Sequence, residues 1–143
     1  MIDPKQFFAD NPDVETLEAF VVDVSGILRG KKMPRQNADK LFKGGVRMPR
    51  SAFAVDIWGQ DVPAAQLIIE TGDNDGVCYP VKNSLRMVPW LKNTAQVMLT
   101  MKEPDGRPFF GDSRQVLKKI VGLYAKKGWT PVVAAELEFY LLD

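Results

Sequence analysis

The sequence predicts an α+β fold in which a β-grasp-like mixed sheet packs against one long helix. Short segments rich in β-branched and other apolar residues recur along the chain, for example at 19–24 and 95–101. Residues 112–127 have the length and the apolar spacing of a long amphipathic helix. The 143 residues suit one domain, and an apolar content of 45% is ordinary for a folded protein.

The first predicted elements are two short helices and a hairpin. Asp3 and Asn11 each precede a proline, and both side chains can cap a helix that begins there. Residues 19–24 predict a strand, and residues 27–32 predict the returning arm of a hairpin. Pro34 is expected to end that arm, because proline cannot donate to a ladder.

The middle of the chain predicts one short helix, an irregular apolar run and a turn. Residues 37–43 are amphipathic and are followed by two glycines that can close a helix. Asp56 interrupts the apolar run 53–58, and a buried carboxylate without a partner is costly. We therefore expect Asp56 to face solvent, to have a partner or to serve a site. Residues 72–76 predict a turn rather than a calcium loop, since no glutamate follows at the EF-hand spacing.

The longest helix is predicted after a strand at 95–101 and a turn at 104–106 that lets residues 107–110 pair back. Residues 112–115 read as a capping box, and the helix should run to about Lys127. Its apolar residues form one stripe that is expected to face the sheet. The members of the stripe are Val116, Leu117, Ile120, Val121 and Tyr124.

Residues 131–143 alternate between apolar and other residues, which predicts a final strand with one face in the core. Glu136 and Glu138 fall on its other face, about 7 Å apart. Two carboxylates at this spacing suit one hard cation each, or two cations bridged by phosphate. On spacing alone, a solvated acidic face is the commoner interpretation.

Composition excludes several kinds of site. The chain has no histidine, which excludes a Ser-His or Cys-His nucleophile pair within it. With one cysteine, Cys78, a thiolate zinc site is also excluded, so any metal must be held by oxygen, which favours Mg²⁺ or Mn²⁺. We expect Cys78 to be inert, because the sequence places no base beside it.

Charge and hydropathy favour neither nucleic acid nor a membrane as partner. The net charge is +1, no run approaches the length of a transmembrane span, and no secretory signal is visible, so the cytoplasm is the expected compartment. A basic run between Arg29 and Arg50 leaves a nucleic-acid binder as an alternative. The same run could be a solvated face, or it could meet a neighbouring subunit or an anionic substrate.

Five separated motifs, in order, resemble the glutamine synthetase family over residues 19–143. The motif residues are Asp23-Val-Ser-Gly-Ile-Leu-Arg-Gly-Lys-Lys-Met-Pro34, Pro89-Trp90, Asp105-Gly106, Asp112-Ser-Arg-Gln-Val-Leu117 and Glu136-Leu-Glu-Phe139. Ser113 stands where the family usually has proline. Segments 46–59 and 132–143 look most like the γ-glutamylpolyamine (γ-glutamylputrescine) synthetase branch. Val55-Asp-Ile-Trp-Gly59 departs from the family's Phe-Asp-Gly-Ser-Ser loop, which puts ammonia in doubt as the substrate.

The resemblance implies that residues 1–143 are the N-terminal β-grasp domain of a longer enzyme. Residues 131–143 would be the first metal-binding strand of a catalytic barrel that is absent from this chain. The full enzyme would use ATP to join the γ-carboxylate of glutamate to an amine through γ-glutamyl phosphate, in polyamine catabolism and nitrogen metabolism. It would be a homo-dodecamer of two stacked hexamers, and the 143 residues alone would be inactive.

The resemblance also implies roles for single residues. Glu136 and Glu138 would bind Mg²⁺ or Mn²⁺, and Asp56 would help to bind and deprotonate the amine. Trp58 and Trp90 would lie near loops that approach the amine pocket. Two alternatives to a polyamine ligase remain open, namely a glutamine synthetase that uses ammonia and a non-catalytic interaction module.

Overall fold

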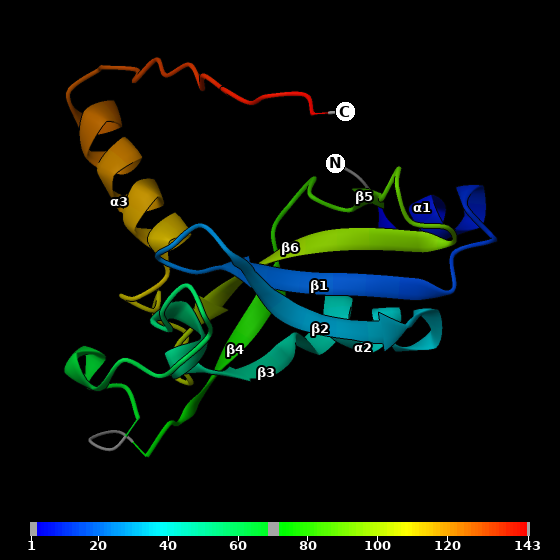
Figure 1. Cartoon of the computed structure of the whole chain (residues 1–143), viewed down its shortest axis with the longest axis horizontal. Coiled ribbons are helices and arrows are strands. Elements are labelled where there is room, and N and C mark those ends of the chain that lie inside the picture. The colour runs from blue at the N-terminus through cyan, green and yellow to red at the C-terminus, as the bar shows by residue number, and fades with distance from the viewer. Residues whose placement is uncertain (1–2, 69–71, 143) are drawn as a thin grey trace.

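The computed structural model describes residues 3–68 and 72–142, and it confirms the α+β class with a mixed sheet. The six strands lie in the order β2-β1-β6-β4-β3, and β5 also pairs with β6 (Figure 1). β1 runs parallel to β6, whereas the other pairs are antiparallel. The strands are β1 (Thr16–Val22), β2 (Leu28–Pro34), β3 (Val46–Pro49), β4 (Asp75–Pro80), β5 (Arg86–Met87) and β6 (Thr94–Lys102).

The predicted hairpin is confirmed as β1 and β2, with Thr16 opposite Pro34 and Val22 opposite Leu28. Pro34 is the last residue of β2, as expected. Gly30 on β2 is packed so tightly against β1 that an added Cβ would lie 2.1 Å from the carbonyl oxygen of Ala19. A side chain at this position would therefore push the two strands apart.

The helices are α1 (Pro4–Asp10), α2 (Ala38–Gly44) and α3 (Ser113–Lys126), with 3-10 turns at Arg35–Asn37, Arg50–Phe53 and Pro63–Ala65. Asp3 caps α1 as predicted, because its side chain accepts from the Lys5 N–H at 3.1 Å. The prediction of a second helix after Asn11 is wrong. Asn11 instead closes α1, since its main-chain and side-chain N–H groups both donate to the Phe7 carbonyl oxygen, at 3.1 and 2.8 Å.

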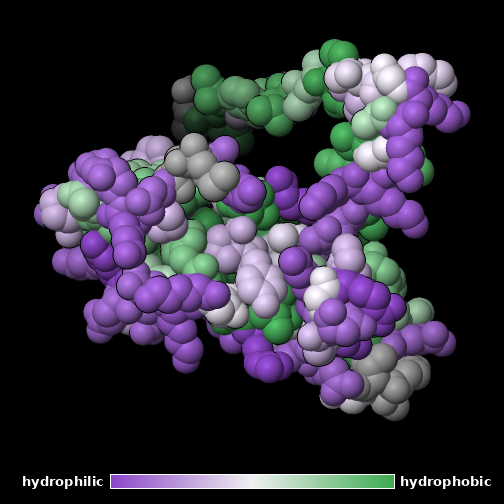
Figure 2. Space-filling model, turned by 180° about the vertical axis from the view of Figure 1, so that it is seen from behind, coloured by the Kyte–Doolittle hydropathy of each residue, from purple (hydrophilic) through white to green (hydrophobic). Residues whose placement is uncertain are grey.

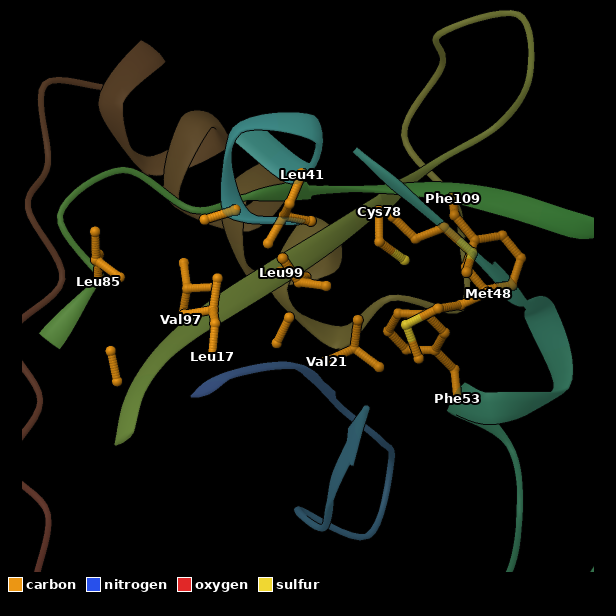
Figure 3. Packing of buried hydrophobic residues seen from close by; sticks show 14 of the residues in the cluster. Leu17, Val21, Leu41, Met48, Phe53, Cys78, Leu85, Val97, Leu99 and Phe109 are labelled. Carbon is orange, nitrogen blue, oxygen red and sulfur yellow. The ribbon is translucent and has the colours of Figure 1, made fainter. Parts of the chain in front are cut away.

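The core lies inside the curve of the sheet, and Figure 3 shows its side chains converging from several elements. β1 and β6 contribute residues that are fully buried, such as Leu17 and Val97, and α2 contributes Leu41. Phe53 and Phe109 close one end of the core with ring centroids 5.4 Å apart. α2 thus covers the sheet, as its amphipathic pattern predicted.

The expected packing of the long helix against the sheet is wrong. α3 projects away from the sheet (Figure 1), and none of its residues, all of which the structure describes, is buried. Its start alone is tied to β6, where Asp112 Oδ2 accepts from Thr100 Oγ1 at 2.6 Å and from the Met101 N–H at 2.9 Å. The amphipathic pattern shows that one face needs a partner, but it does not say which partner.

The N-terminus of α3 matches only half of the predicted capping box. Asp112 Oδ1 accepts from the Arg114 N–H at 2.9 Å, as a cap should. Gln115, which was expected to bond back to the cap residue, donates from its side chain to Thr100 Oγ1 at 2.6 Å. The side chain of Gln115 therefore fixes the helix to β6 and does not complete the box.

The predicted final strand does not form within residues 131–142, and Asp143 lies outside the described residues. These residues run as an exposed segment, in which Val132 and Leu141 are 93% and 91% exposed. Figure 2 shows the hydrophobic side chains of this segment along an arm that stands clear of the body. A strand needs a neighbouring edge for its hydrogen bonds, and no described strand pairs with this segment.

β4 is an element that the sequence prediction missed. The predicted turn at 72–76 is present at Gly72 and Asp73, but Asp75 already begins the strand. β4 contains Gly76 and ends at Pro80, and both residue types are uncommon in strands. β4 nonetheless joins β3 to β6 in the sheet.

Candidate functional site

Asp56 lies in a tight loop rather than in the strand-like run that the sequence contains. The loop is closed by an antiparallel bridge between Val55 and Asp61. Within it, the Asp56 N–H donates to the Gln60 carbonyl oxygen at 2.9 Å, and the Gly59 N–H donates to the Asp56 carbonyl oxygen at 3.0 Å. Gly59 has a φ of +82°, which suits glycine at this bend.

The Asp56 carboxylate is half-buried and holds its own loop. Its Oδ1 accepts from the N–H groups of Trp58 and Gln60, both at 2.8 Å. No hydrogen bond from the described residues reaches Oδ2. Of the three alternatives expected for Asp56, namely solvent exposure, a partner or a site, the structure shows partners within its own loop, and Oδ2 remains able to accept a further hydrogen bond.

Arg29 ties this loop to the turn of the β1–β2 hairpin. Its guanidinium donates to the Asp56 carbonyl oxygen at 3.0 Å, and its Nε donates to Asp23 Oδ2 at 2.8 Å. Asp23 Oδ1 accepts from the Ser25 and Ile27 N–H groups, at 2.9 and 2.8 Å. Burial alone would raise the pKa of Asp23, but the hydrogen bonds from Arg29, Ile27 and Ser25 outweigh it, so this pKa lies below its ordinary value.

Two further contacts fix the segment that leads into the loop. Arg50, at the start of the 3-10 turn, forms an ion pair with Glu103, and both side chains are largely buried. The Val24 N–H donates to the Phe53 carbonyl oxygen at 3.2 Å. The backbone on the amino-terminal side of Asp56 is therefore held by the hairpin and by the residue that follows β6.

Large apolar side chains stand beside Asp56. Ile57 and Trp58 are both exposed, and Trp58 has 81% of its surface accessible. Trp90 is also exposed, but it lies in the connection between β5 and β6. The structure thus places Trp58 next to Asp56, and no contact between Trp58 and Trp90 is found among the described residues.

Glu136 and Glu138 lie in the exposed segment that follows α3 and are not brought to Asp56. The described residues contain no group of three or more His, Cys, Asp or Glu side chains that could hold a metal ion. Carboxylate oxygens are the ligands that Mg²⁺ and Mn²⁺ prefer, so the chemistry of the two glutamates fits such an ion. Two carboxylates are too few to complete the coordination of such an ion, so further ligands are needed.

The network of Asp23 and Arg29 was not predicted as part of the site. Asp23 lies inside the apolar run 19–24, where a charged residue needs a partner, and this position was the signal that could have found it. Arg29 follows six residues later on the returning arm of the hairpin. Residues of a hairpin that flank its turn lie close together, so the pairing could have been inferred.

None of the helices in the described part of the chain has the length and apolarity that a membrane crossing requires. No protein-family model matches the chain. The curated relatives it matches are longer, and the chain spans about three tenths of their length.

Comparison with known proteins gives both sequence relatives and structural neighbours. A γ-glutamylputrescine synthetase, PuuA, of Escherichia coli is 39% identical over 97% of this chain and 29% of its own length. A glutamate–isopropylamine ligase of a Pseudomonas species is 26% identical over 95% of the chain and 30% of its own length. A glutamine synthetase of Methanosarcina mazei is 29% identical over 90% of the chain and 27% of its own length.

The solved structures agree on the fold. A GmaS structure with ADP superposes with a TM-score of 0.68 at 23% identity, covering 89% of this chain and 26% of that protein. A glutamine synthase homologue superposes with a TM-score of 0.67 at 19% identity, covering 80% of this chain and 27% of that protein. The resemblance predicted from the five motifs is confirmed, because the homologues of this chain are members of the glutamine synthetase family.

Proposed function

We propose that this chain is the N-terminal domain of an ATP-dependent ligase that joins the γ-carboxylate of glutamate to an amine through γ-glutamyl phosphate. The amine we propose is a polyamine such as putrescine. The observation that carries this proposal is the identity of 39% with a γ-glutamylputrescine synthetase over 97% of the chain. In such a reaction ATP is a substrate whose site lies mostly outside these residues.

Asp56 is the residue that we propose to bind the incoming amine. One of its oxygens is used by the loop, which fixes the direction of the carboxylate, and the other can accept from an ammonium group. The exposed side chains of Ile57 and Trp58 could contact the methylene chain of a diamine. Loss of a proton from the ammonium to Asp56 would give the neutral amine that attacks the acyl phosphate.

Glu136 and Glu138 are the residues that we propose as metal ligands, completed by ligands beyond this chain. When bound, Mg²⁺ or Mn²⁺ would offset the charge of the phosphates during transfer. The spacing of the two carboxylates, at i and i+2, suits two neighbouring cations once the segment is held as a strand. Because a strand requires a partner edge, this proposal also requires that a further part of the protein pairs with residues 131–142.

The exposed apolar surface of α3 and of the segment after it supports a longer protein. The stripe that includes Leu117 and Ile120 has no cover among the described residues. An uncovered apolar surface of this extent is typical of a contact with another domain or subunit. We place the complete enzyme in the cytoplasm as a homo-dodecamer, in which this domain meets a neighbouring subunit.

An amine screen on the complete enzyme tests the proposal. Phosphate release would be followed with ATP, Mg²⁺ and glutamate against ammonia, putrescine, spermidine and simple monoamines. Preference for a diamine is the expected result. Preference for ammonia would assign a glutamine synthetase, an outcome that the relative from Methanosarcina mazei also permits. Absence of phosphate release with every amine would favour a non-catalytic module.

A further inference from the structure

A cavity of the described chain lies beside the two outer strands of the sheet, β2 and β3. It has a volume of about 780 Å³ and is walled by β2, α2, β3 and β4. β2 and β3 are the two ends of the strand order, yet Lys31 Nζ on β2 donates to the Arg47 carbonyl oxygen on β3 at 3.2 Å. The cavity is therefore lined by both outer strands, by β4 and by α2. Figure 1 shows α2 beside β2.

Cations from three elements surround this cavity. Lys31 and Lys32 come from β2, Lys40 from α2 and Arg47 from β3, and none of the described residues that line the cavity is acidic. Lys32 is paired with Glu18 at 2.9 Å. The side chains of Lys40 and Arg47 make no ion pair or hydrogen bond with the described residues. Like charges held together repel one another, and a bound anion would relieve that repulsion.

The same cavity has an apolar wall. Leu41 of α2 and Val77 and Tyr79 of β4 contribute to the lining. Gly45 lets the end of α2 approach β4 closely, since its φ is +73° and an added Cβ would lie 2.7 Å from the Cys78 carbonyl oxygen. A ligand that fits this lining has an anionic group that meets the lysine and arginine side chains and an apolar or aromatic part that contacts the apolar wall.

We propose that this cavity binds an organic phosphate. A phosphate group offers several oxygens to donors that converge from different directions, which matches Lys31, Lys40 and Arg47 on three separate elements. The volume lies in the range of small-molecule pockets. The inference gives a role to Lys31, Lys40 and Arg47 within the basic run, and it does not depend on the proposed ligase activity.

The experiment is a titration of this 143-residue chain, followed by two-dimensional NMR, with tripolyphosphate and with ATP as probes. Both are added without divalent cation, so that Glu136 and Glu138 cannot account for binding through a metal. The expected result is a shift of the amide signals of Gly44, Gly45 and Val77. ATP should bind more tightly than tripolyphosphate, because the apolar wall adds contacts. Binding should weaken between about 0.02 M and about 0.2 M salt.

Two matched variants decide whether the cavity is responsible. Lys40→Ser with Arg47→Ser should weaken ATP binding by about tenfold or more. Lys118→Ser with Lys119→Ser removes the same charge from exposed positions of α3 and should leave the affinity unchanged. A similar loss in both variants, or shifts confined to α3, would overturn the proposal.

Three other outcomes would also overturn it. No shift at about 10 mM of either probe, a concentration that detects even millimolar affinity, would mean that the cavity binds no phosphate. Equal affinity for ATP and tripolyphosphate would exclude an organic ligand that uses the apolar wall. Tighter binding of an acidic peptide than of ATP at the same amides would assign the cavity to a protein partner.

Discussion

Arg29 and Asp56 are joined by a hydrogen bond of 3.0 Å from the guanidinium to the main-chain carbonyl, although they lie 27 residues apart. The same guanidinium pairs with Asp23, whose side chain is fully buried. The geometry of the Asp56 loop therefore depends on a carboxylate in the turn of the hairpin. Neither Asp23 nor Arg29 is proposed to touch the amine, so both act through the loop.

Replacing Arg29 by methionine should lower the free energy of unfolding by about 1.5–3 kcal/mol, the range for a hydrogen bond to a charged group. The loss arises because Asp23 would remain buried without its cationic partner. Urea titration measures it. Arg107→Met is the control, because Arg107 pairs with Asp105 on the exposed surface and its removal should change little. Equal losses in the two variants would contradict a special role for Arg29.

Acidification should remove the stabilisation that Asp23 provides. The pKa of Asp23 is lowered in the folded state, so on acidification the unfolded chain binds this proton first, near its ordinary pKa of about 3.9. The contribution is therefore fully present well above about pH 4 and is lost as the pH falls through the lower, folded-state pKa. Unfolding free energies of the wild type and of Asp23→Asn, compared between about pH 7 and pH 3, should converge at the acid end. A difference independent of pH would contradict this account.

The parts of the fold that local signals determine were predictable from sequence. The hairpin follows from two β-rich arms around Ser25 and Gly26, and α2 follows from an amphipathic run closed by glycine. The position of α3 was not predictable, because its stripe specifies an apolar face without naming the surface that covers it. The prediction of a final strand at 131–143 failed for a similar reason. Alternating residues form a strand only when a neighbouring strand edge is available for hydrogen bonding.

The candidate site also contains one part that the sequence predicted and one part that it did not. Asp56 stood out because a carboxylate interrupts an apolar run, and the structure gives it partners within its own loop. Its link to Arg29 joins segments far apart in sequence and needed the three-dimensional arrangement. Glu136 and Glu138 stay predictions, because the described residues supply no third ligand.

Truncation of a core leucine and of an α3 leucine should destabilise this chain to very different extents. Leu99→Ala should cost about 2–5 kcal/mol of unfolding free energy, because Leu99 is buried in the core. Leu117→Ala should change it by less than about 0.5 kcal/mol, because Leu117 on α3 is 60% exposed. Chemical denaturation of both variants checks the pair. A large effect of Leu117→Ala would mean that α3 is covered in solution, for example by a second copy of the chain.

Cys78 should resist thiol reagents while the protein is folded. Burial, and to a smaller extent the charge of Asp112, raise the pKa of the thiol to about 12, so little thiolate exists near neutral pH. Labelling by a disulfide reagent at about pH 8 should be slow in buffer and fast in urea. Rapid labelling in buffer, with the unfolding transition unchanged, would show that β4 opens locally and would contradict this expectation.

Replacing Asp56 by asparagine separates the shape of its loop from its charge. Asparagine keeps an oxygen that can accept from the Trp58 and Gln60 N–H groups, so the loop should keep its conformation and the unfolding free energy should change little. The charge that we propose to hold the ammonium group is lost. In the complete enzyme we therefore expect a rise of about tenfold or more in KM for the diamine, with the KM for ATP unchanged.

The matched change is Asp61→Asn, at the other end of the same loop, which should leave all three quantities near those of the wild type. Isopropylamine or another monoamine provides a second comparison, because any amine that Asp56 binds as a cation should lose affinity in the Asp56→Asn variant. If Asp56→Asn instead lowered turnover with every amine while leaving each KM unaltered, Asp56 would act on the proton rather than on binding. If neither constant moved, the amine site would lie elsewhere, and Asp56 would serve only as the cap of its own loop.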